Sequence, residues 1–232
     1  MNLFFGEIDT EVRIAPEEQQ HILKVLRLGS GDPIAVTDGK GQIASGLLRV
    51  EGKKALIEHT TLRKEPFPFV PALHLAIAPT KNIDRTEFFL EKATEMGVDK
   101  VTFIQCDHSE RKQINIEKLQ RQAIAACKQS RRVYFPEVEG LISFKSFIET
   151  IIPGRTFVAH CNNQLERHEL SGLPLLEKIT ILIGPEGDFS AGEIALLQEK
   201  GVGGISLGFQ RLRTETAGLY VAAWNYQRMS LD

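Results

Sequence analysis

The stretch that decides the fold of the second half of the chain is Ile179-Thr180-Ile181-Leu182-Ile183-Gly184-Pro185-Glu186-Gly187-Asp188-Phe189-Ser190. Its apolar first part predicts a buried strand, and the two glycines around Pro185-Glu186 predict a tight turn. Ser190 and Glu193 have the spacing of a capping box, so a helix follows. In such a strand–turn–helix unit a ligand lies outside the carboxyl end of the strand. The alternative is a simple connection with Ser190 as N-cap.

A second glycine-containing loop follows another short apolar run. After Ile205-Ser206-Leu207 the chain continues as Gly208-Phe209-Gln210-Arg211-Leu212-Arg213-Thr214-Glu215-Thr216-Ala217. Residues 217–226 are apolar almost all round, which is typical of a helix buried by core or by a partner subunit. In structural terms alone, Thr214 or Thr216 would be an N-cap, and Arg213 and Glu215 a surface pair. Two glycine turns at two strand ends favour a ligand site instead.

Around these loops, short apolar strands alternate with helices from residue 72 onward. Strands are predicted over 73–78, 101–104, 156–159, 179–183 and 204–207. A helix is predicted over 85–96, capped by Asp84 with Glu87 and ended by Gly97. This alternation predicts an α/β fold with a parallel sheet covered on both faces. The chain has no Gly-x-x-x-x-Gly-Lys-Ser/Thr and no Gly-x-Gly-x-x-Gly after its first strand, which argues against a P-loop or a dinucleotide site.

The first part of the chain has a different pattern. Three prolines in residues 65–71 force an extended path, and a domain boundary is predicted there. Before it, Asp38-Gly39 lies between two apolar runs and predicts a hairpin. One helix is expected over 16–26, with Ile22, Val25 and Leu26 at helical spacing. These features predict a small barrel-like β module.

Composition limits the class of protein. The 232 residues carry 28 Lys+Arg against 30 Asp+Glu, a net charge of −2, so a protein that coats polyanions over its whole surface is excluded. Three scattered cysteines argue against a disulfide framework or a thiolate zinc site, and the six histidines show no ligand spacing, so no metal is predicted. No signal peptide and no run long enough to span a membrane is seen, and a cytoplasmic protein is expected.

The motifs together resemble the bacterial ribosomal RNA small subunit methyltransferase E family. The resemblance covers the whole chain and rests on the two loops, with His21-x-x-x-Val25-Leu26-Arg27, Lys81-x-x-x-Arg85 and Gln129-Ser130-x-Arg132 as supporting motifs. Two positions depart from the family pattern. Asp188 stands where the family usually has a second glycine, and Gln210-Arg211 stands where it favours Arg-Ile.

The resemblance implies a fold and an activity. It implies a PUA-like β-barrel over 1–68 and, over 72–232, a SPOUT domain whose C-terminal part forms a deep trefoil knot. It also implies a homodimer that methylates N3 of a uridine in 16S ribosomal RNA, within the small ribosomal subunit, with S-adenosylmethionine as donor. The donor site would comprise Leu182, Ile183, Gly184, Pro185, Glu186, Gly187, Leu207, Gly208, Leu212, Thr214, Thr216 and Ala217.

Two charged residues are the catalytic candidates. Transfer to uracil N3 requires loss of the N3 proton and stabilisation of charge on the carbonyl oxygens. Arg213 is expected to stabilise that charge. Glu215 is the candidate base, but an ordinary glutamate pKa is low for the task, so a role in orienting Arg213 is favoured.

A cluster of positive charge indicates where RNA binds. Residues 111–132 hold seven Lys/Arg and one acidic residue, Glu117. A solvated helix face is the alternative explanation, but phosphate contacts dominate RNA affinity. The candidates for RNA contact are Lys24, Arg27, Arg111, Lys118, Arg121, Lys128 and Arg132.

Two other functions stay open at this point. A phosphate-ester hydrolase could use glycine loops, but no Walker lysine or carboxylate cluster supports it. A non-catalytic RNA-binding or assembly protein would use the barrel to bind and the second domain to dimerise. Binding of S-adenosylmethionine separates both from a methyltransferase.

Overall fold

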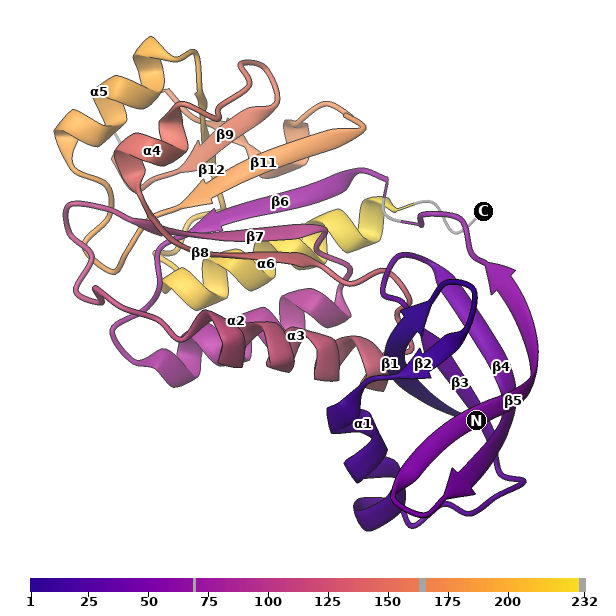
Figure 1. Cartoon of the computed structure of the whole chain (residues 1–232). Helices are drawn as coiled ribbons and strands as arrows, with labels where there is room; N and C mark the ends of the chain where they lie inside the picture. Colours follow the sequence, from indigo (N-terminus) through magenta and orange to yellow (C-terminus); the bar gives the residue numbers. More distant parts are fainter. Residues whose placement is uncertain (69, 163–165, 230–232) are drawn as a thin grey trace. The chain divides into compact units, whose positions relative to one another are not determined.

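The computed structural model describes residues 1–68, 70–162 and 166–229, which fold as two units (Figure 1). The first unit comprises Met1–Phe67 and Cys127–Phe135. The second comprises Pro68–Ala126 and Pro136–Asp232. Each unit has its own hydrophobic core, and the limits 1–68 and 72–232 expected for the two domains stay a prediction.

The first unit is a nearly closed barrel of five strands in the order β2-β1-β3-β4-β5. β1 and β3 pair in parallel, the other neighbours are antiparallel, and the outer strands β2 and β5 also contact each other. Phe4, Ile34, Val36 and Leu48 fill its core. The predicted barrel is confirmed. The strands are β1 (Asn2–Ile8), β2 (Val12–Ile14), β3 (Pro33–Thr37), β4 (Gln42–Glu51) and β5 (Lys54–Lys64).

The helix expected over 16–26 forms in two parts between β2 and β3. These are α1 (Pro16–Gln20) and a π-helical turn, η1 (His21–Val25). Ile22 is fully buried in the barrel core, as its spacing predicted. Val25 and Leu26, named at the same spacing, are exposed, because the π-helical turn does not keep the α-helical period on which that prediction relied. The side chain of Glu18 is also buried, and the Lys128 ammonium from the second segment of this unit pairs with it. This pair joins two segments that lie far apart in the sequence.

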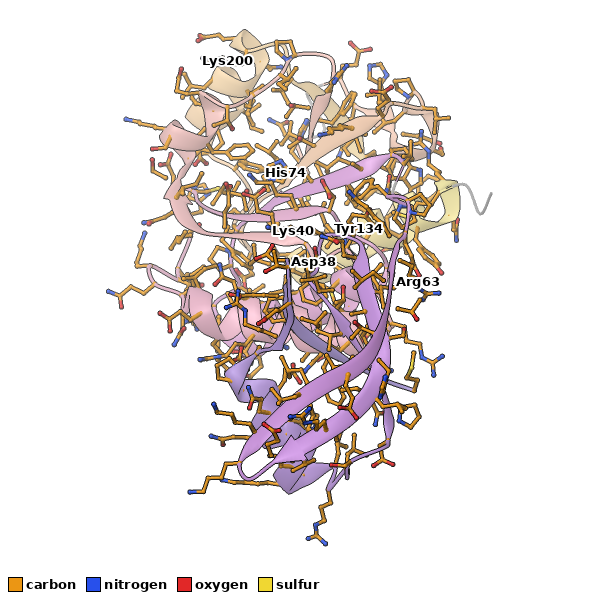
Figure 2. All side chains as sticks on the ribbon, turned by 45° about the vertical axis from the view of Figure 1, so that its right-hand side comes forward. Asp38, Lys40, Arg63, His74, Tyr134 and Lys200 are labelled. Atoms are coloured by element: carbon orange, nitrogen blue, oxygen red, sulfur yellow. The ribbon has the colours of Figure 1, made fainter. Side chains whose placement is uncertain are left out.

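Further contacts attach the segment Cys127–Phe135 to the barrel. The Gly41 N–H donates to the carbonyl oxygen of Val133 at 3.0 Å, and Phe135 N–H donates to that of Gly39 at 2.9 Å. Lys40 and Tyr134 form an isolated antiparallel bridge, and both are labelled in Figure 2. The hairpin turn between β3 and β4 therefore receives an additional short strand-like segment from residues far along the chain.

The second unit is an α/β domain with an all-parallel sheet in the order β10-β12-β9-β11-β6-β7-β8. It confirms the predicted fold class. Because β11 pairs with β9, and β12 pairs with the other side of β9, the carboxyl ends of these three strands are neighbours. The strands are β6 (Ala72–Ile77), β7 (Lys100–Gln105), β8 (Glu137–Ser143), β9 (Thr156–Ala159), β10 (His168–Glu169), β11 (Lys178–Ile183) and β12 (Gly203–Ser206).

Helices cover both faces of this sheet (Figure 1). On one face, α2 (Ile83–Glu95), α3 (Ile116–Gln129) and α6 (Thr214–Arg228) pack on the side chains of Leu75 and Ile77 and their neighbours. On the other, α4 (Phe144–Ile148) and α5 (Ala191–Glu199) pack on Ala76, Leu182 and neighbouring residues. A short 3-10 turn, η2 (Leu170–Gly172), follows β10.

After β12 at the far side of β9, the chain returns so that α6 packs against α2 and β6. Gly218 permits this close approach, because a Cβ atom there would lie 2.5 Å from the Phe89 ring. This return brings the start of α6 beside the turn after β11. The knotted threading that the resemblance implies stays a prediction.

Two expected helix starts are wrong. Asn82, not Asp84, is the N-cap of α2, because its side chain accepts the Asp84 N–H at 3.0 Å and the helix begins one residue after it. Neither Thr214 nor Thr216 caps α6. The cap is Arg213, and Thr214 is inside the helix. The capping box of Ser190 and Glu193 is confirmed.

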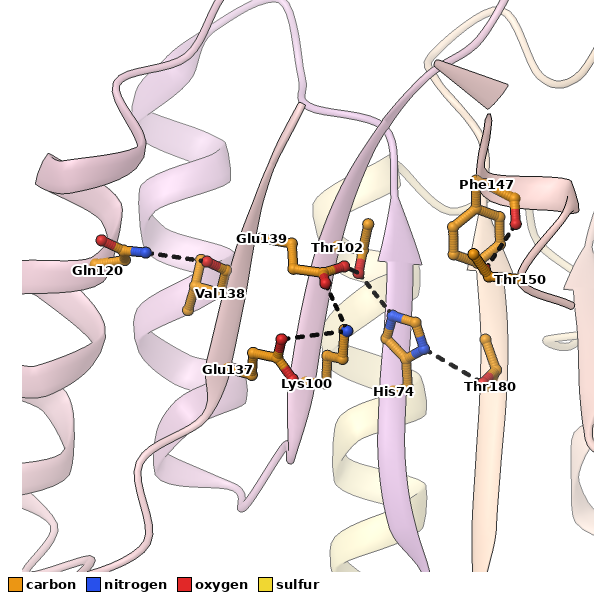
Figure 3. A network of polar contacts seen from close by, with 10 residues as sticks. All are labelled: His74, Lys100, Thr102, Gln120, Glu137, Val138, Glu139, Phe147, Thr150 and Thr180. Carbon is orange, nitrogen blue, oxygen red and sulfur yellow. Dashed lines mark hydrogen bonds and ion pairs between the residues drawn. The ribbon is translucent and has the colours of Figure 1, made fainter. Parts of the chain in front are cut away.

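A network of polar side chains crosses the amino-terminal half of the sheet (Figure 3). Thr102 Oγ1 donates to Glu139 Oε2 at 2.6 Å, so it accepts the Nε2–H of His74 at 2.8 Å. The Nδ1 atom of His74 then accepts the Thr180 hydroxyl at 3.3 Å. Lys100 donates to the other Glu139 oxygen at 2.7 Å. Four strands, β11, β6, β7 and β8, thus share one hydrogen-bonded chain.

Two features are absent from the described ranges. None of their helices has the length and apolar character needed to cross a membrane. Nor do they contain three or more His, Cys, Asp or Glu side chains grouped so as to hold a metal ion.

Candidate functional site

A pocket of about 250 Å³ lies at the neighbouring carboxyl ends of β9, β11 and β12. The turn after β11 and the loop between β12 and α6 form much of its wall, so the two glycine loops meet as expected for strands of one parallel sheet. Nine of the residues expected to bind a donor line it: Ile183, Gly184, Pro185, Glu186, Leu207, Gly208, Leu212, Thr214 and Ala217.

The other three expected donor residues do not line the pocket. Leu182 is fully buried and points to the α4 and α5 side, because neighbouring residues of a strand face opposite ways. Gly187 packs on His108, where a Cβ atom would come within 2.9 Å of the His108 Cβ. Thr216 is exposed in the first turn of α6.

One hydrogen bond joins the two glycine loops directly. The Thr214 hydroxyl donates to the carbonyl oxygen of Gly184 at 3.0 Å, and Thr214 is buried. A buried hydroxyl with a partner holds both loops in place, because leaving either the hydroxyl or the carbonyl group unpaired is costly. The start of α6 is therefore held against the turn after β11, and Arg213 precedes this fixed point.

The two catalytic candidates lie in different surroundings. Arg213 lines the pocket and is exposed. Glu215 does not line it. Its side chain is buried, with Oε1 3.8 Å from the Arg85 Nε, and the described residues show no ion pair between Glu215 and Arg213. The expected direct orientation of Arg213 by Glu215 is therefore not found, and Arg85 is a neighbour that sequence reasoning missed.

Polar contacts hold the outer side of the turn after β11. Glu186 accepts the Lys81 N–H at 3.0 Å through its side chain, and its carbonyl oxygen accepts Arg211 Nη2 at 3.0 Å. The guanidinium of Arg111 donates to the carbonyl oxygens of Thr80 and Lys81. The loop after β6 and the loop before α6 thus both brace this turn.

Several polar pocket residues were not predicted from the sequence. They are His160, Cys161, Arg167, Asp188, Gln210 and Arg211. Burial, with the nearby Arg167 charge, lowers the pKa of His160, so its imidazole is neutral at pH 7. Burial and the Asp188 carboxylate raise the pKa of Cys161, so its thiol stays protonated. The sequence signal that could have identified His160 and Cys161 was their position directly after β9, because all strands of a parallel sheet have their carboxyl ends at one edge.

The candidate RNA-binding cations fall into three groups. Lys24, Arg27, Lys118 and Arg121 are exposed, although Lys118 pairs with Glu87. Arg111 is half-buried on the carbonyl groups described above. Lys128 pairs with the buried Glu18, and Arg132 is only 7% exposed. Lys128 and Arg132 therefore pack within the first unit, which is neither the RNA contact expected for them nor the solvated helix face given as the alternative.

Two family models match this chain, one over each of the two kinds of fold described above. An RNA methyltransferase domain model matches residues 67–225, and an RNA methyltransferase PUA domain model matches residues 14–57. The chain is thus an RNA methyltransferase of the SPOUT class.

Its relatives define the family more closely. The chain is 30% identical over 221 residues to the ribosomal RNA small subunit methyltransferase E of Synechocystis, covering 90% of this chain and 71% of that protein. It belongs to the ribosomal RNA small subunit methyltransferase E family, as the sequence motifs predicted.

Solved structures agree with this fold. A probable rRNA methyltransferase from Porphyromonas gingivalis superposes with a TM-score of 0.89 at 36% identity, covering 99% of this chain and 98% of that one. A ribosomal RNA small subunit methyltransferase E from Neisseria gonorrhoeae, bound to S-adenosyl methionine, gives a TM-score of 0.81 at 24% identity. That match covers 99% and 98% of the two chains.

Proposed function

We propose that this chain transfers a methyl group from S-adenosylmethionine to N3 of a uridine in 16S ribosomal RNA. The observation that carries the proposal is the pocket itself, in which both glycine loops meet and Arg213 stands on the wall. Membership of the family supports the reaction class, and the name of the family supports the small-subunit RNA as substrate.

The pocket residues fit S-adenosylmethionine. Ile183, Leu207 and Leu212 offer apolar side chains for the adenine ring, and the turns at Gly184 and Gly208 bring backbone groups to the pocket. Recognition by backbone hydrogen bonds requires few charged side chains. When bound, S-adenosylmethionine supplies an electrophilic methyl group on a sulfonium.

Arg213 has the position to assist the acceptor base. Uracil N3 carries a proton at neutral pH that must pass to a water molecule, and negative charge then develops on the flanking carbonyl oxygens. A guanidinium on the pocket wall stabilises this charge. Glu215 lies outside the pocket lining and beside Arg85. We therefore assign it the positioning of the first turn of α6, and with it of Arg213, rather than the role of base.

The same proposal includes the partners. The exposed cations Lys24, Arg27, Lys118 and Arg121 are assigned to RNA phosphates, and the target uridine leaves its stack to expose N3. The assembled small subunit is included as the substrate, and the enzyme acts as a homodimer in the cytoplasm.

Two experiments test this function. Calorimetry with S-adenosylmethionine is expected to show saturable micromolar binding, and its absence would favour a hydrolase or a non-catalytic RNA-binding protein. Mass mapping of 16S rRNA from cells lacking the protein is expected to show one uridine without its methyl group, restored when the protein is returned. Unchanged rRNA would refute the proposed reaction.

A further inference from the structure

The turn after β11 contains a residue in an unusual backbone conformation. Asp188 has a φ of +63°, in the left-handed region that glycine adopts most easily, and its N–H closes the turn on the carbonyl oxygen of Pro185 at 2.9 Å. Aspartate tolerates this region better than most residues but still adopts it at a cost. A glycine would form the same turn without this cost, so the role of an aspartate here lies in its side chain.

The carboxylate of Asp188 joins two loops of the pocket. Its Oδ2 accepts the backbone N–H of Cys161 at 2.8 Å, and its Oδ1 accepts the N–H of Phe189 at 2.9 Å. Cys161 lies in the loop after β9, so the first bond connects that loop with the turn after β11. Hydrogen bonds to a charged acceptor are stronger than those between neutral groups.

The backbone around Asp188 is held from a third loop. The His108 Nδ1–H, in the loop after β7, donates to the carbonyl oxygens of Gly187 at 3.2 Å and of Asp188 at 3.0 Å. The carboxylate is thus presented from a fixed backbone. On the pocket side, Asp188, Cys161 and His160 all line the cavity.

We propose that Asp188 is a positioning residue of the donor pocket, whose carboxylate holds the backbone at Cys161, just after β9, in the position that binds S-adenosylmethionine. The inference rests on the proposed function, because it assumes that this pocket takes the methyl donor. A glycine at this position would not join the two loops, whereas the Asp188 carboxylate joins them by a hydrogen bond. Preorganising a binding wall in this way raises affinity without new contacts to the ligand.

Two substitutions separate the backbone from the carboxylate. Asp188→Gly keeps the left-handed turn and removes both hydrogen bonds, whereas Asp188→Asn keeps one acceptor oxygen. We expect Asp188→Gly to raise the Kd and the KM for S-adenosylmethionine about tenfold and Asp188→Asn about threefold. The kcat at saturating donor and the Tm should stay close to those of the unchanged protein, a split that general destabilisation would not produce.

A matched control is His59→Gly. His59 also has a positive φ, +53°, and is exposed in the first unit, so this change relieves a similar backbone cost without touching the pocket. It should leave the donor Kd unchanged. If Asp188→Gly binds the donor as tightly as the unchanged protein, this inference alone is overturned. If the unchanged protein binds no donor, the proposed function fails and the inference falls with it.

Cys161 provides an independent readout. Its thiol is exposed, whereas Cys106 and Cys127 are buried, so N-ethylmaleimide should modify Cys161 first. Both Asp188 substitutions remove the negative charge that helps to raise the pKa of the Cys161 thiol, and Asp188→Gly also frees the loop. Alkylation should therefore be fastest in Asp188→Gly and intermediate in Asp188→Asn. Equal alkylation rates in the unchanged protein and the two variants would contradict the proposed role of the Asp188 carboxylate.

Discussion

The polar side chains at the two ends of the seven-stranded sheet differ in what satisfies them. In the amino-terminal half, a line of hydrogen bonds joins His74 to Thr102, Thr102 to Glu139 and Glu139 to Lys100. At the carboxyl ends of β9, β11 and β12, Arg213 lines a pocket and makes no ion pair among the described residues. A buried polar group contributes to stability when the protein itself completes its hydrogen bonds.

The difference separates stability from function within one domain. The internal network lies on the face covered by α4, where the His74 ring packs against Phe147, and none of its residues lines the pocket at the carboxyl ends of β9, β11 and β12. The pocket end instead presents the exposed guanidinium of Arg213, for which the described residues show no ion pair and which a ligand can therefore pair with. Substitutions in the two regions should therefore move different measurements, stability in one case and turnover in the other.

The largest effect is expected from Arg213→Ala. Loss of the guanidinium beside the developing charge should lower methyl transfer about 10²- to 10³-fold, the usual cost of removing one such donor. The donor Kd and the Tm should hardly change, because Arg213 is exposed and makes no ion pair among the described residues. Single-turnover transfer to 16S rRNA measures the rate of methyl transfer, and calorimetry measures the donor Kd and the Tm.

Arg213→Lys is the matched variant, since it retains the charge but not the planar fork. It should recover part of the lost rate. Normal turnover in Arg213→Ala, with donor affinity unaltered, would show that the charge is stabilised by another group.

The internal network should instead determine how stability depends on pH. Burial and the neighbouring Lys100 lower the pKa of His74 from 6.5 to about 4, although Glu139 opposes this. Because the unfolded chain protonates near 6.5 and the folded chain only near 4, the unfolded state gains the proton as pH falls through this window. The His74 contribution, about 3 kcal/mol, should be present above pH 6.5 and lost by pH 4.

Urea unfolding of the unchanged protein and of His74→Gln at pH 7, 5.5 and 4 isolates this contribution from the carboxylates. The free-energy difference between the two proteins should shrink as the pH falls. A difference that is the same at all three values would show that His74 titrates normally.

A smaller loss of stability is expected from Thr102→Val. The two side chains have the same shape, but valine removes the hydroxyl that connects the His74 ring with Glu139. Because Thr102 is fully buried, the Nε2–H of His74 would be left without an acceptor, and the free energy of unfolding should fall by about 2 kcal/mol. Thr180→Val is the control, since its bond to His74 is longer, 3.3 Å, and its loss should cost less. A reduced donor affinity in Thr102→Val would contradict the separation of the two regions.

The sequence predicted the pocket end better than the network end, for a physical reason. Glycines that follow an apolar strand mark a turn at the edge where ligands bind, so two motifs predicted that the two glycine loops form a ligand site. Nine of the twelve residues that the family resemblance assigned to the donor line the pocket found there. His160 and Cys161 lie at the same edge, but after β9 no glycine marks the turn. Asp188 was noted only as a departure, because its bond to Cys161 spans 27 residues.

The network could not be found in this way. Its members are single polar residues on four strands, and only the register of β11, β6, β7 and β8 makes them neighbours. Strand β8, Glu137–Ser143, was itself missed, because its two glutamates and Gly140 do not have the apolar pattern of a buried parallel strand. Glu139 is half-exposed at this edge of the sheet, where a carboxylate is tolerated.

The smallest effect concerns the cations of α3. Lys118 and Arg121 are exposed, so Lys118→Gln with Arg121→Gln should weaken RNA binding severalfold and reduce the slope of log K against log salt by about 1.5, as two lost phosphate contacts require. The charge-matched control is Lys145→Gln, on α4, combined with Lys200→Gln, at the end of α5. This double variant should leave the slope unchanged. Filter binding to 16S rRNA at several salt concentrations measures both. Equal slopes in the two double variants would place the RNA on another surface and leave Lys118 as the surface partner of Glu87.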